Sequence, residues 1–172
     1  MAFRANVERE MPRFDEGRDL ESLTAWLDFH RATLLMKLDG LDDEQLRRVM
    51  VPSGLSLLGL VKHLTSVEHG WFAMGIGQSG EPPLFYSKDD PDADFRIEED
   101  DTTDAIVTGY LRACERSREI VREAGSLDVY FEHPRRGRVT LRWVLLHMVE
   151  ETARHNGHAD IMRELIDGAT GD

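Results

Sequence analysis

The sequence has little cysteine, a deficit of positive charge and no long apolar run. A single cysteine, Cys114, excludes an internal disulfide bond and a metal site built from several thiolates. The 33 acidic residues against 21 basic ones give a formal charge of -12, which argues against binding to phosphate backbones. No apolar run approaches the roughly 20 residues that span a bilayer. We therefore expect a cytoplasmic protein that binds neither nucleic acid nor membrane.

What is present is the composition of a folded globular domain. Apolar residues make up 41% of the 172 residues and charged residues 31%, which suffices for one hydrophobic core. The chain contains neither an internal repeat nor a low-complexity tract. We expect one domain, residues 1–172. Because thiolates are lacking, any metal would have to be bound by histidine and carboxylate side chains.

Four segments carry apolar residues at the three- and four-residue spacing of amphipathic helices. These segments are 19–41, 55–75, 102–124 and 140–167. Glycines are predicted to end three of them, and threonine or aspartate to cap two. The predicted ends are Gly40, Gly125 and Gly168, and the predicted caps are Asp101 or Thr102 and Thr140. The pattern predicts an all-α fold, a four-helix bundle.

The connections between these segments differ greatly in length. Residues 75–101 concentrate Gly, Pro and Asp, which predicts a long acidic loop that crosses the bundle between the second and third helices. Residues 42–50 are compatible with a short helical turn. Residues 126–139 are compatible with either a short strand or an irregular crossover.

A carboxylate and an imidazole interrupt the apolar stripe of the last predicted helix. At roughly 100 degrees per residue, Glu151 falls in the middle of that stripe, and His155 follows one turn later on the same side. A buried carboxylate without a partner costs several kcal/mol or stays protonated, so this position requires a compensating group. Residues four apart come within about 5 to 6 Å at Cβ, close enough to bind one ion. His63, on the shoulder of the second helix's stripe, offers a third ligand.

Two imidazoles and one carboxylate are a ligand set for a catalytic divalent metal. Three protein ligands leave coordination positions open for water or substrate, and the set suits Zn(II) while also accepting Ni(II) or Fe(II). The alternative is ordinary packing, since a Glu-x3-His pair is common on helices and a lone His63 more often packs. His147 and His158 also lie near the stripe, and we interpret both as groups that support the ligands or relay a proton.

Other motifs carry weaker signals. The basic cluster "PRRGR" with Arg142 is either a solvated turn or a site for an anionic substrate group, with Arg138 and Arg142 as its candidates. Cys114 lies on the apolar side of the third helix, which favours inert packing over nucleophilic catalysis. The tryptophans at helical spacing are interpreted as core residues, and His69 and His133 are expected to be exposed.

Two stretches resemble a known family. "HLTSVEHGWF" in the second helix and "LRWVLLHMVEETARHNGHADIMRELIDG" in the last are similar to the DinB-like superfamily, in particular its actinobacterial branch of mycothiol-dependent transferases. The resemblance extends over nearly the whole chain. It implies an up-down-down-up bundle with one divalent metal, held at the positions of His63, Glu151 and His155. Glu151 stands where many members have histidine, and "HNGHAD" departs from the family's His-Arg-Gly-Gln stretch.

The resemblance and the ligand set together give a leading hypothesis and two alternatives. The leading one is a metal-dependent transferase that activates a low-molecular-weight thiol, with mycothiol implied, for attack on an electrophile in detoxification or stress. The alternatives are a non-catalytic metal-binding stress protein and a non-heme Fe(II) oxygenase. Exposed apolar helix faces are also compatible with a homodimer.

Overall fold

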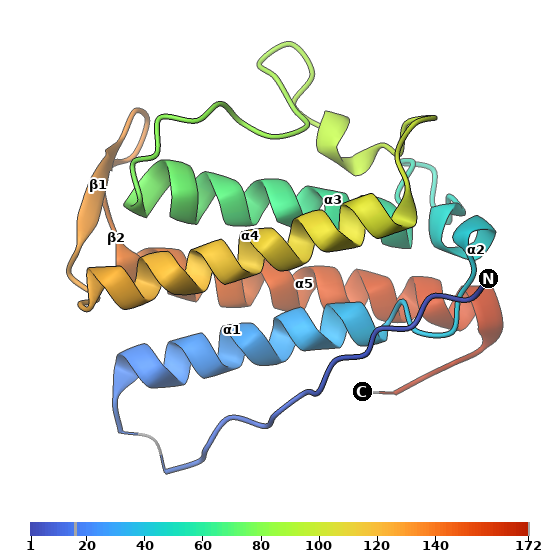
Figure 1. Ribbon diagram of the computed structural model, residues 1–172, viewed down its shortest axis with the longest axis horizontal. Coiled ribbons are helices and arrows are strands. Elements are labelled where there is room, and N and C mark those ends of the chain that lie inside the picture. Colours follow the sequence, from blue (N-terminus) through green and yellow to red (C-terminus); the bar gives the residue numbers. More distant parts are fainter. Residues whose placement is uncertain (16, 172) are drawn as a thin grey trace.

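The computed structural model of the protein describes residues 1–15 and 17–171, and most of them are helical (Figure 1). The helical elements are α1 (Asp19–Met36), α2 (Asp43–Arg47), α3 (Leu57–Glu68), the π-helix η1 (His69–Ile76), the 3-10 turn η2 (Ala93–Phe95), α4 (Thr103–Ala124) and α5 (Leu141–Asp167). The strands β1 (Tyr130–His133) and β2 (Gly137–Thr140) form an antiparallel hairpin. The prediction that the fold is mostly helical is confirmed. The two-stranded hairpin is an element that an all-α fold does not include.

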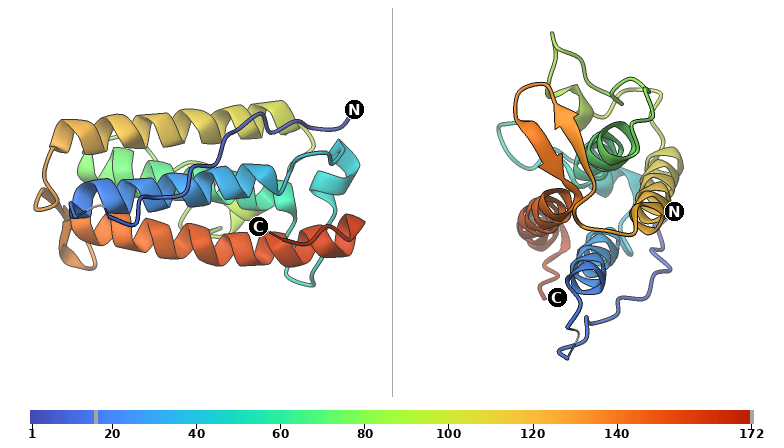
Figure 2. Two further views of the ribbon diagram at one scale, coloured as in Figure 1. Left: turned by 90° about the horizontal axis from the view of Figure 1, so that it is seen from below. Right: turned by 90° about the vertical axis from the view of Figure 1, so that its left-hand side faces the viewer.

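The long helices lie lengthwise beside one another (Figure 2). α1 and α5 run in one direction, whereas α3 and α4 run in the other (Figure 1). Because α3 and α4 are parallel, the chain has to return along the length of the molecule between them, and residues 77–102 make this return. The β hairpin and α2 lie at opposite ends of the molecule. This arrangement brings α3 and α5 side by side, with the long connection passing above α3.

α4 and α5 begin and end where the sequence predicts. The hydroxyl groups of Thr102 and Thr140 accept hydrogen bonds from backbone N–H groups three residues later, at 3.2 and 3.3 Å. Gly125 and Gly168 end the helices with φ of 63° and 77°, a left-handed conformation that favours glycine. The first helix differs from the prediction: α1 ends at Met36, and the chain turns before it reaches Gly40.

The second predicted helix changes its winding partway along. It is an α-helix only to Glu68, and residues His69–Ile76 form a π-helix, in which Gly77 N–H donates to the Phe72 carbonyl five residues earlier. Gly75 lies within this wider segment and against the hairpin. A Cβ atom added at Gly75 would come within 2.9 Å of the Phe131 ring of β1. A larger residue at position 75 would therefore force the Phe131 ring to move away from η1.

Two apolar clusters fill the interior, one toward each end of the molecule. A polar layer lies between them at mid-length. Arg31 of α1 donates to both carboxylate oxygens of Glu68 at 2.7 and 2.6 Å, and Ser117 of α4 donates to the same carboxylate at 2.6 Å. All three side chains are buried, and the pairing compensates the charges. Glu151 and His155 occupy the corresponding level of α5, between the same two clusters.

Several burial predictions are wrong. Trp26 and Trp143, expected in the core, are 39% and 36% exposed. The prediction that the side chains of His69 and His133 are exposed is also wrong. His69 is only 12% exposed at its side chain and hydrogen-bonds through Nε2 to a backbone carbonyl, while His133 is half-buried. None of the described helices is long and apolar enough to cross a membrane.

Candidate metal centre

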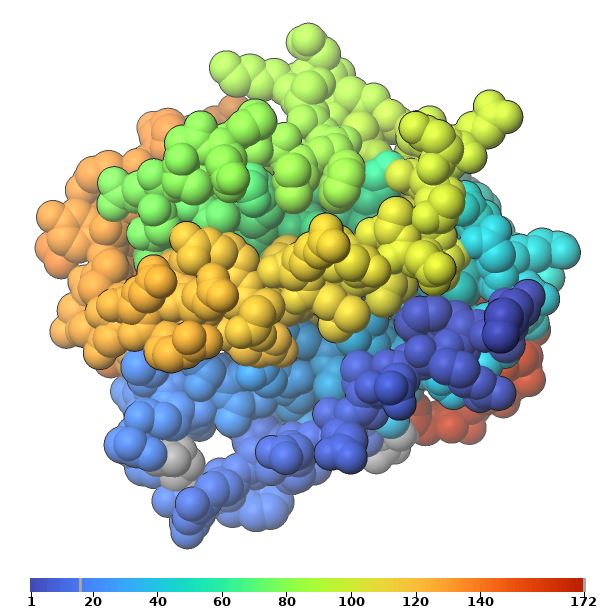
Figure 3. Space-filling model, viewed as in Figure 1, coloured from blue at the N-terminus to red at the C-terminus, as the bar shows by residue number. Residues whose placement is uncertain are grey.

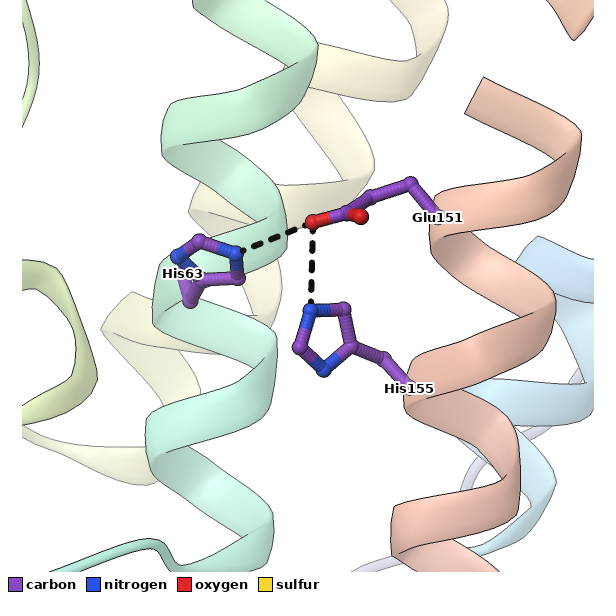
Figure 4. Close-up of side chains that lie close together, drawn as sticks. All are labelled: His63, Glu151 and His155. Atoms are coloured by element: carbon purple, nitrogen blue, oxygen red, sulfur yellow. Dashed lines mark hydrogen bonds and ion pairs between the residues drawn. The ribbon is translucent and has the colours of Figure 1, made fainter. Parts of the chain in front are cut away.

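His63, Glu151 and His155 converge between α3 and α5 (Figure 4). One carboxylate oxygen, Glu151 Oε1, lies 3.5 Å from His63 Nε2 and 3.2 Å from His155 Nε2. One ligand atom from each side chain lies within 4.8 Å of the other two, so the three could hold a metal ion. The structure thus brings together the three residues that the sequence predicts as ligands.

The triad lies at the edge of the core. The side chains of His63 and Glu151 are each 14% exposed, and that of His155 is 10% exposed. Most of each side chain is therefore surrounded by protein, and a small part of each is exposed to solvent. Glu151 and His155 share one face of α5 because they are four residues apart, and His63 faces them from α3.

The two imidazoles and the carboxylate shift each other's pKa values. Hydrogen bonds with His155 and with His63 hold the pKa of Glu151 far below its ordinary value. Burial alone would lower the pKa of His63, but hydrogen bonds with Asp94 and Glu151 outweigh it and raise this pKa. Glu151 is therefore an anion across the physiological pH range, as a metal ligand has to be.

Asp94 supports the triad from the long connection and was not predicted. Its Oδ2 atom lies 3.0 Å from His63 Nδ1, and the residue is only 3% exposed in the turn η2. Asp94 Oδ1 has no hydrogen-bond partner among the described residues. A carboxylate that accepts the Nδ1–H of a histidine fixes the tautomer whose Nε2 lone pair is free to bind a metal.

Phe95, the next residue, covers the same imidazole. Its ring stacks on His63 with centroids 3.8 Å apart and planes inclined by 15°, and it lies 6.1 Å from the His155 ring. The turn η2 thus contributes a carboxylate to one edge of His63 and an aromatic ring to its face. Together these contacts fix the orientation of a side chain that would otherwise rotate about two bonds.

The two other histidines near the predicted stripe lie in different surroundings. His158 is exposed, and its Nδ1 lies 3.3 Å from Nδ1 of His155, so it contacts a triad member directly. His147 stacks on Trp143 at 4.9 Å, and its Nδ1 lies 3.5 Å from Glu150. A supporting or proton-relaying role stays a prediction for both.

The two arginines predicted to hold an anionic group lie at the hairpin end of the molecule. Arg142 forms an ion pair with Asp19 at 2.6 Å, and the Arg138 guanidinium lies 3.9 Å from the centre of the Tyr130 ring. Within residues 1–15 and 17–171, neither contacts a member of the triad. Their role in substrate binding stays a prediction, and the ion pair already neutralises Arg142.

The residues fit a divalent cation. Ligand atoms about 2.0 to 2.2 Å from a tetrahedral ion lie roughly 3.4 Å from one another, close to the 3.2 and 3.5 Å separations of the two imidazoles from Glu151. Imidazole nitrogen and carboxylate oxygen are ligands for Zn(II), Ni(II) and Fe(II). The carboxylate of Asp94 behind His63 is the arrangement that accompanies metal-binding histidines.

Two cavities between α1 and α4 lie away from the triad. Their volumes are about 620 and 310 Å³, and the larger one lies beside the N-terminal segment. Figure 3 shows the hollow that this segment and α1 border. The two arginines that line both spaces are already neutralised, since Arg31 pairs with Asp28 and Glu68 and Arg118 pairs with Asp28. Cys114 lines the larger space, but burial raises the pKa of its thiol to about 12, so it is not a nucleophile at neutral pH.

Two neighbouring helices of a mostly helical fold thus carry two imidazoles and a carboxylate in positions to hold one cation. This defines the class of the protein, a helical protein with a candidate metal centre. The family model described as mycothiol S-transferase matches residues 22–168, and the chain belongs to this family. The resemblance seen in the sequence is confirmed, and the matched region contains the whole triad. No curated protein matches the sequence significantly.

Proposed function

We propose that the protein is a metal-dependent transferase that activates mycothiol, a low-molecular-weight thiol, for attack on an electrophile. Its role would be detoxification or a response to stress. The observation that carries the proposal is the convergence of His63, Glu151 and His155, and membership of the mycothiol S-transferase family supports the choice of thiol. In this proposal residues 1–172 are one domain, a DinB-like four-helix bundle.

The triad would hold one divalent cation, with Zn(II) favoured and Ni(II) or Fe(II) as alternatives. A cation bound there supplies positive charge that stabilises the thiolate of a nearby thiol and lowers its pKa. Three protein ligands leave room beside the triad for the sulfur atom. The exposure of 10 to 14% at the triad side chains is consistent with access by a small molecule.

The surrounding side chains would orient the ligands and carry the proton. Asp94 accepts the Nδ1–H of His63 and so presents Nε2 toward Glu151. Phe95 excludes water from one face of His63. His158 extends from Nδ1 of His155 to the surface, where it can pass the thiol proton to solvent.

The reaction that follows is a substitution or an addition at carbon. In the substitution the thiolate sulfur forms a bond to the electrophilic carbon, and the leaving group departs with the electron pair of the bond that breaks. The thiol proton passes to solvent. No redox partner is needed, because the electron pair that the thiolate supplies to carbon is matched by the pair that leaves with the leaving group.

The test incubates purified protein with Zn(II), mycothiol and the fluorogenic electrophile monochlorobimane. We expect turnover that disappears on chelation, falls at least about 100-fold in His63→Ala, and stays within about twofold in His69→Ala. His69 is a matched control, since it lies six residues farther along the same helical segment and hydrogen-bonds to the Pro82 carbonyl instead of the triad. Turnover equal to the metal-free blank would overturn the proposal, and a metal whose removal unfolds an inactive protein would favour the non-catalytic stress protein.

A further inference from the structure

A cluster of rings joins α3 and α5 toward the hairpin end of the molecule. We call Trp71, Trp143, His133 and His147 the aromatic platform. The indole rings of Trp71 and Trp143 lie 5.0 Å apart with planes inclined by 56°. His147 stacks on Trp143 at 4.9 Å, and His133 stacks on Trp71 at 5.9 Å. Rings from η1, α5 and β1 therefore meet at one place.

The aromatic platform lies on the same two helical segments as the triad. His147 and Trp143 precede Glu151 by four and eight residues, about 6 and 12 Å along α5. Trp71 follows His63 by eight residues, through the start of η1. A π-helix has more residues per turn than an α-helix, so each residue rotates less about the helix axis. Trp71 therefore lies closer to the face that carries His63 than it would if the α-helix continued. His147 and Trp71 thus continue the side of the two helical segments that carries the triad, and Trp143 packs beside both.

The hairpin turn places positive charge beside this platform. The guanidinium of Arg136 lies 5.8 Å from the centre of the Trp71 ring and 5.3 Å from that of Trp143, within the range of cation–π attraction. Among the described residues, no carboxylate lies within ion-pair distance of Arg135, Arg136 or Arg138, whereas Arg142 is paired with Asp19. On a protein with a formal charge of -12, this turn is a local site for an anion.

Packing alone does not account for the arrangement. The hairpin is already anchored by Phe131, which lies against Gly75 at a distance that leaves no room for a methyl group. Trp143 is still 36% exposed and Tyr130 44% exposed, so aromatic surface remains open to solvent. Partly exposed indole surface with a guanidinium beside it that no described carboxylate pairs is suited to a flat, anionic ligand.

We propose that the aromatic platform and Arg136 bind the electrophilic substrate, and that this substrate is a planar conjugated molecule carrying a carboxylate. Its ring would stack on the exposed indole of Trp143, and its carboxylate would accept hydrogen bonds from the Arg136 guanidinium. This would direct the reactive carbon along α5 toward Glu151. The inference rests on the proposed function and specifies the second substrate of that reaction.

Two aryl chlorides with related reacting carbons provide the probes. Chloronitrobenzoate carries the carboxylate, and chlorodinitrobenzene is its neutral counterpart. In both, the thiolate sulfur bonds to the ring carbon, the carbon–chlorine bond breaks, chloride leaves with the electron pair, and the thiol proton passes to the buffer. Only the first can pair with Arg136.

We expect Arg136→Gln to raise the KM for chloronitrobenzoate about tenfold and to leave that for chlorodinitrobenzene within about twofold. Arg135→Gln removes the same charge from the same turn without touching the rings, and should change neither KM. Trp143→Ala should raise both values at least about threefold, because it removes the stacking surface. Leu146→Ala, at a residue that is 53% exposed one turn away, is its control.

A binding measurement separates this inference from the proposed function. In metal-free protein, nitrobenzoate, which has no leaving group, should quench tryptophan fluorescence, and Arg136→Gln should weaken this binding about tenfold while binding of nitrobenzene is unchanged. If Arg136→Gln affects both electrophiles equally or neither, the inference is wrong although the transferase stands. If nitrobenzoate binds in this Arg136-dependent way but no thiol reacts with either chloride, the proposed function is wrong and the binding site stands.

Discussion

The substitution Asp94→Asn tests whether the long connection contributes to the proposed metal centre. Asparagine has the shape of aspartate and can still accept the Nδ1–H of His63, so the change removes mainly the negative charge behind the imidazole. A hydrogen bond to a charged group contributes about 1.5 to 3 kcal/mol, against about 0.5 to 1.5 for a neutral one. The difference, about 1 to 2 kcal/mol, corresponds to a loss of about 5- to 30-fold in affinity for Zn(II). The 3.0 Å separation of the two atoms and the 3% exposure of Asp94 favour the upper part of this range.

The affinity is measured by competition with a chromophoric chelator at fixed pH, and the free energy of unfolding of the metal-free protein is measured alongside. Asp92→Asn is the matched control, because Asp92 precedes η2 by one residue and its side chain is exposed. We expect the control to bind Zn(II) as the wild type does. An Asp94→Asn protein that folds normally and keeps the wild-type affinity within twofold would refute the reasoning.

Three further predictions test other parts of the structure. Gly75→Ala should lower the free energy of unfolding by about 1 to 3 kcal/mol in urea because it forces a methyl group against β1, whereas Gly70→Ala, with nothing within 4 Å, should be neutral or stabilising by up to about 1 kcal/mol. Burial raises the pKa of Asp101, but the hydrogen bond from Lys62 at 2.7 Å and the positive charge of Lys62 help to lower this pKa overall. The ionised Asp101 therefore stabilises the fold above about pH 4, and this stabilisation is lost as the pH falls through the pKa of Asp101 in the folded protein. Asp101→Asn should therefore reduce the free energy of unfolding by about 1 to 2 kcal/mol at pH 7, with the difference from wild type shrinking toward pH 2; a constant difference would contradict the assignment. The thiol of Cys114 should react with a disulfide reagent at pH 8 only after unfolding, and rapid reaction of the native protein would show that its pKa is not raised.

The candidate ligands could be predicted because one of them, Glu151, is a charged residue at a position where the helical pattern calls for an apolar one. Such a contradiction implies a compensating partner. His155 follows from helical geometry, and His63 from the requirement for a facing helix. The family resemblance then selected the same three positions.

Asp94 could not be predicted, because nothing in its local sequence distinguishes it from its neighbours. The connection contains six aspartates: Asp89, Asp90, Asp92, Asp94, Asp100 and Asp101. Only the path of the chain over α3 decides which one is buried. A single hint was present, since Phe95 is an apolar residue in an acidic stretch and could have been taken as an anchor to the core.

The π-helix was missed for a different reason. The apolar spacing through His69–Ile76 fits an α-helix well enough, and the choice of a wider turn depends on packing against β1 and α4. The wrong predictions of burial for Trp26 and Trp143 have a similar origin. A helical wheel gives the direction of a side chain but does not tell whether another element covers that side, and α1 and α5 are covered on only part of their surfaces.

The measurement that tests the central claim most directly is metal content after equilibrium dialysis against buffered Zn(II), for the wild type beside Glu151→Ala. The account predicts one ion per chain in the wild type and none in the variant at the same free concentration, with both proteins folded by circular dichroism. Equal Zn(II) content in the two proteins would contradict it, because the cation would then be bound somewhere other than between His63, Glu151 and His155.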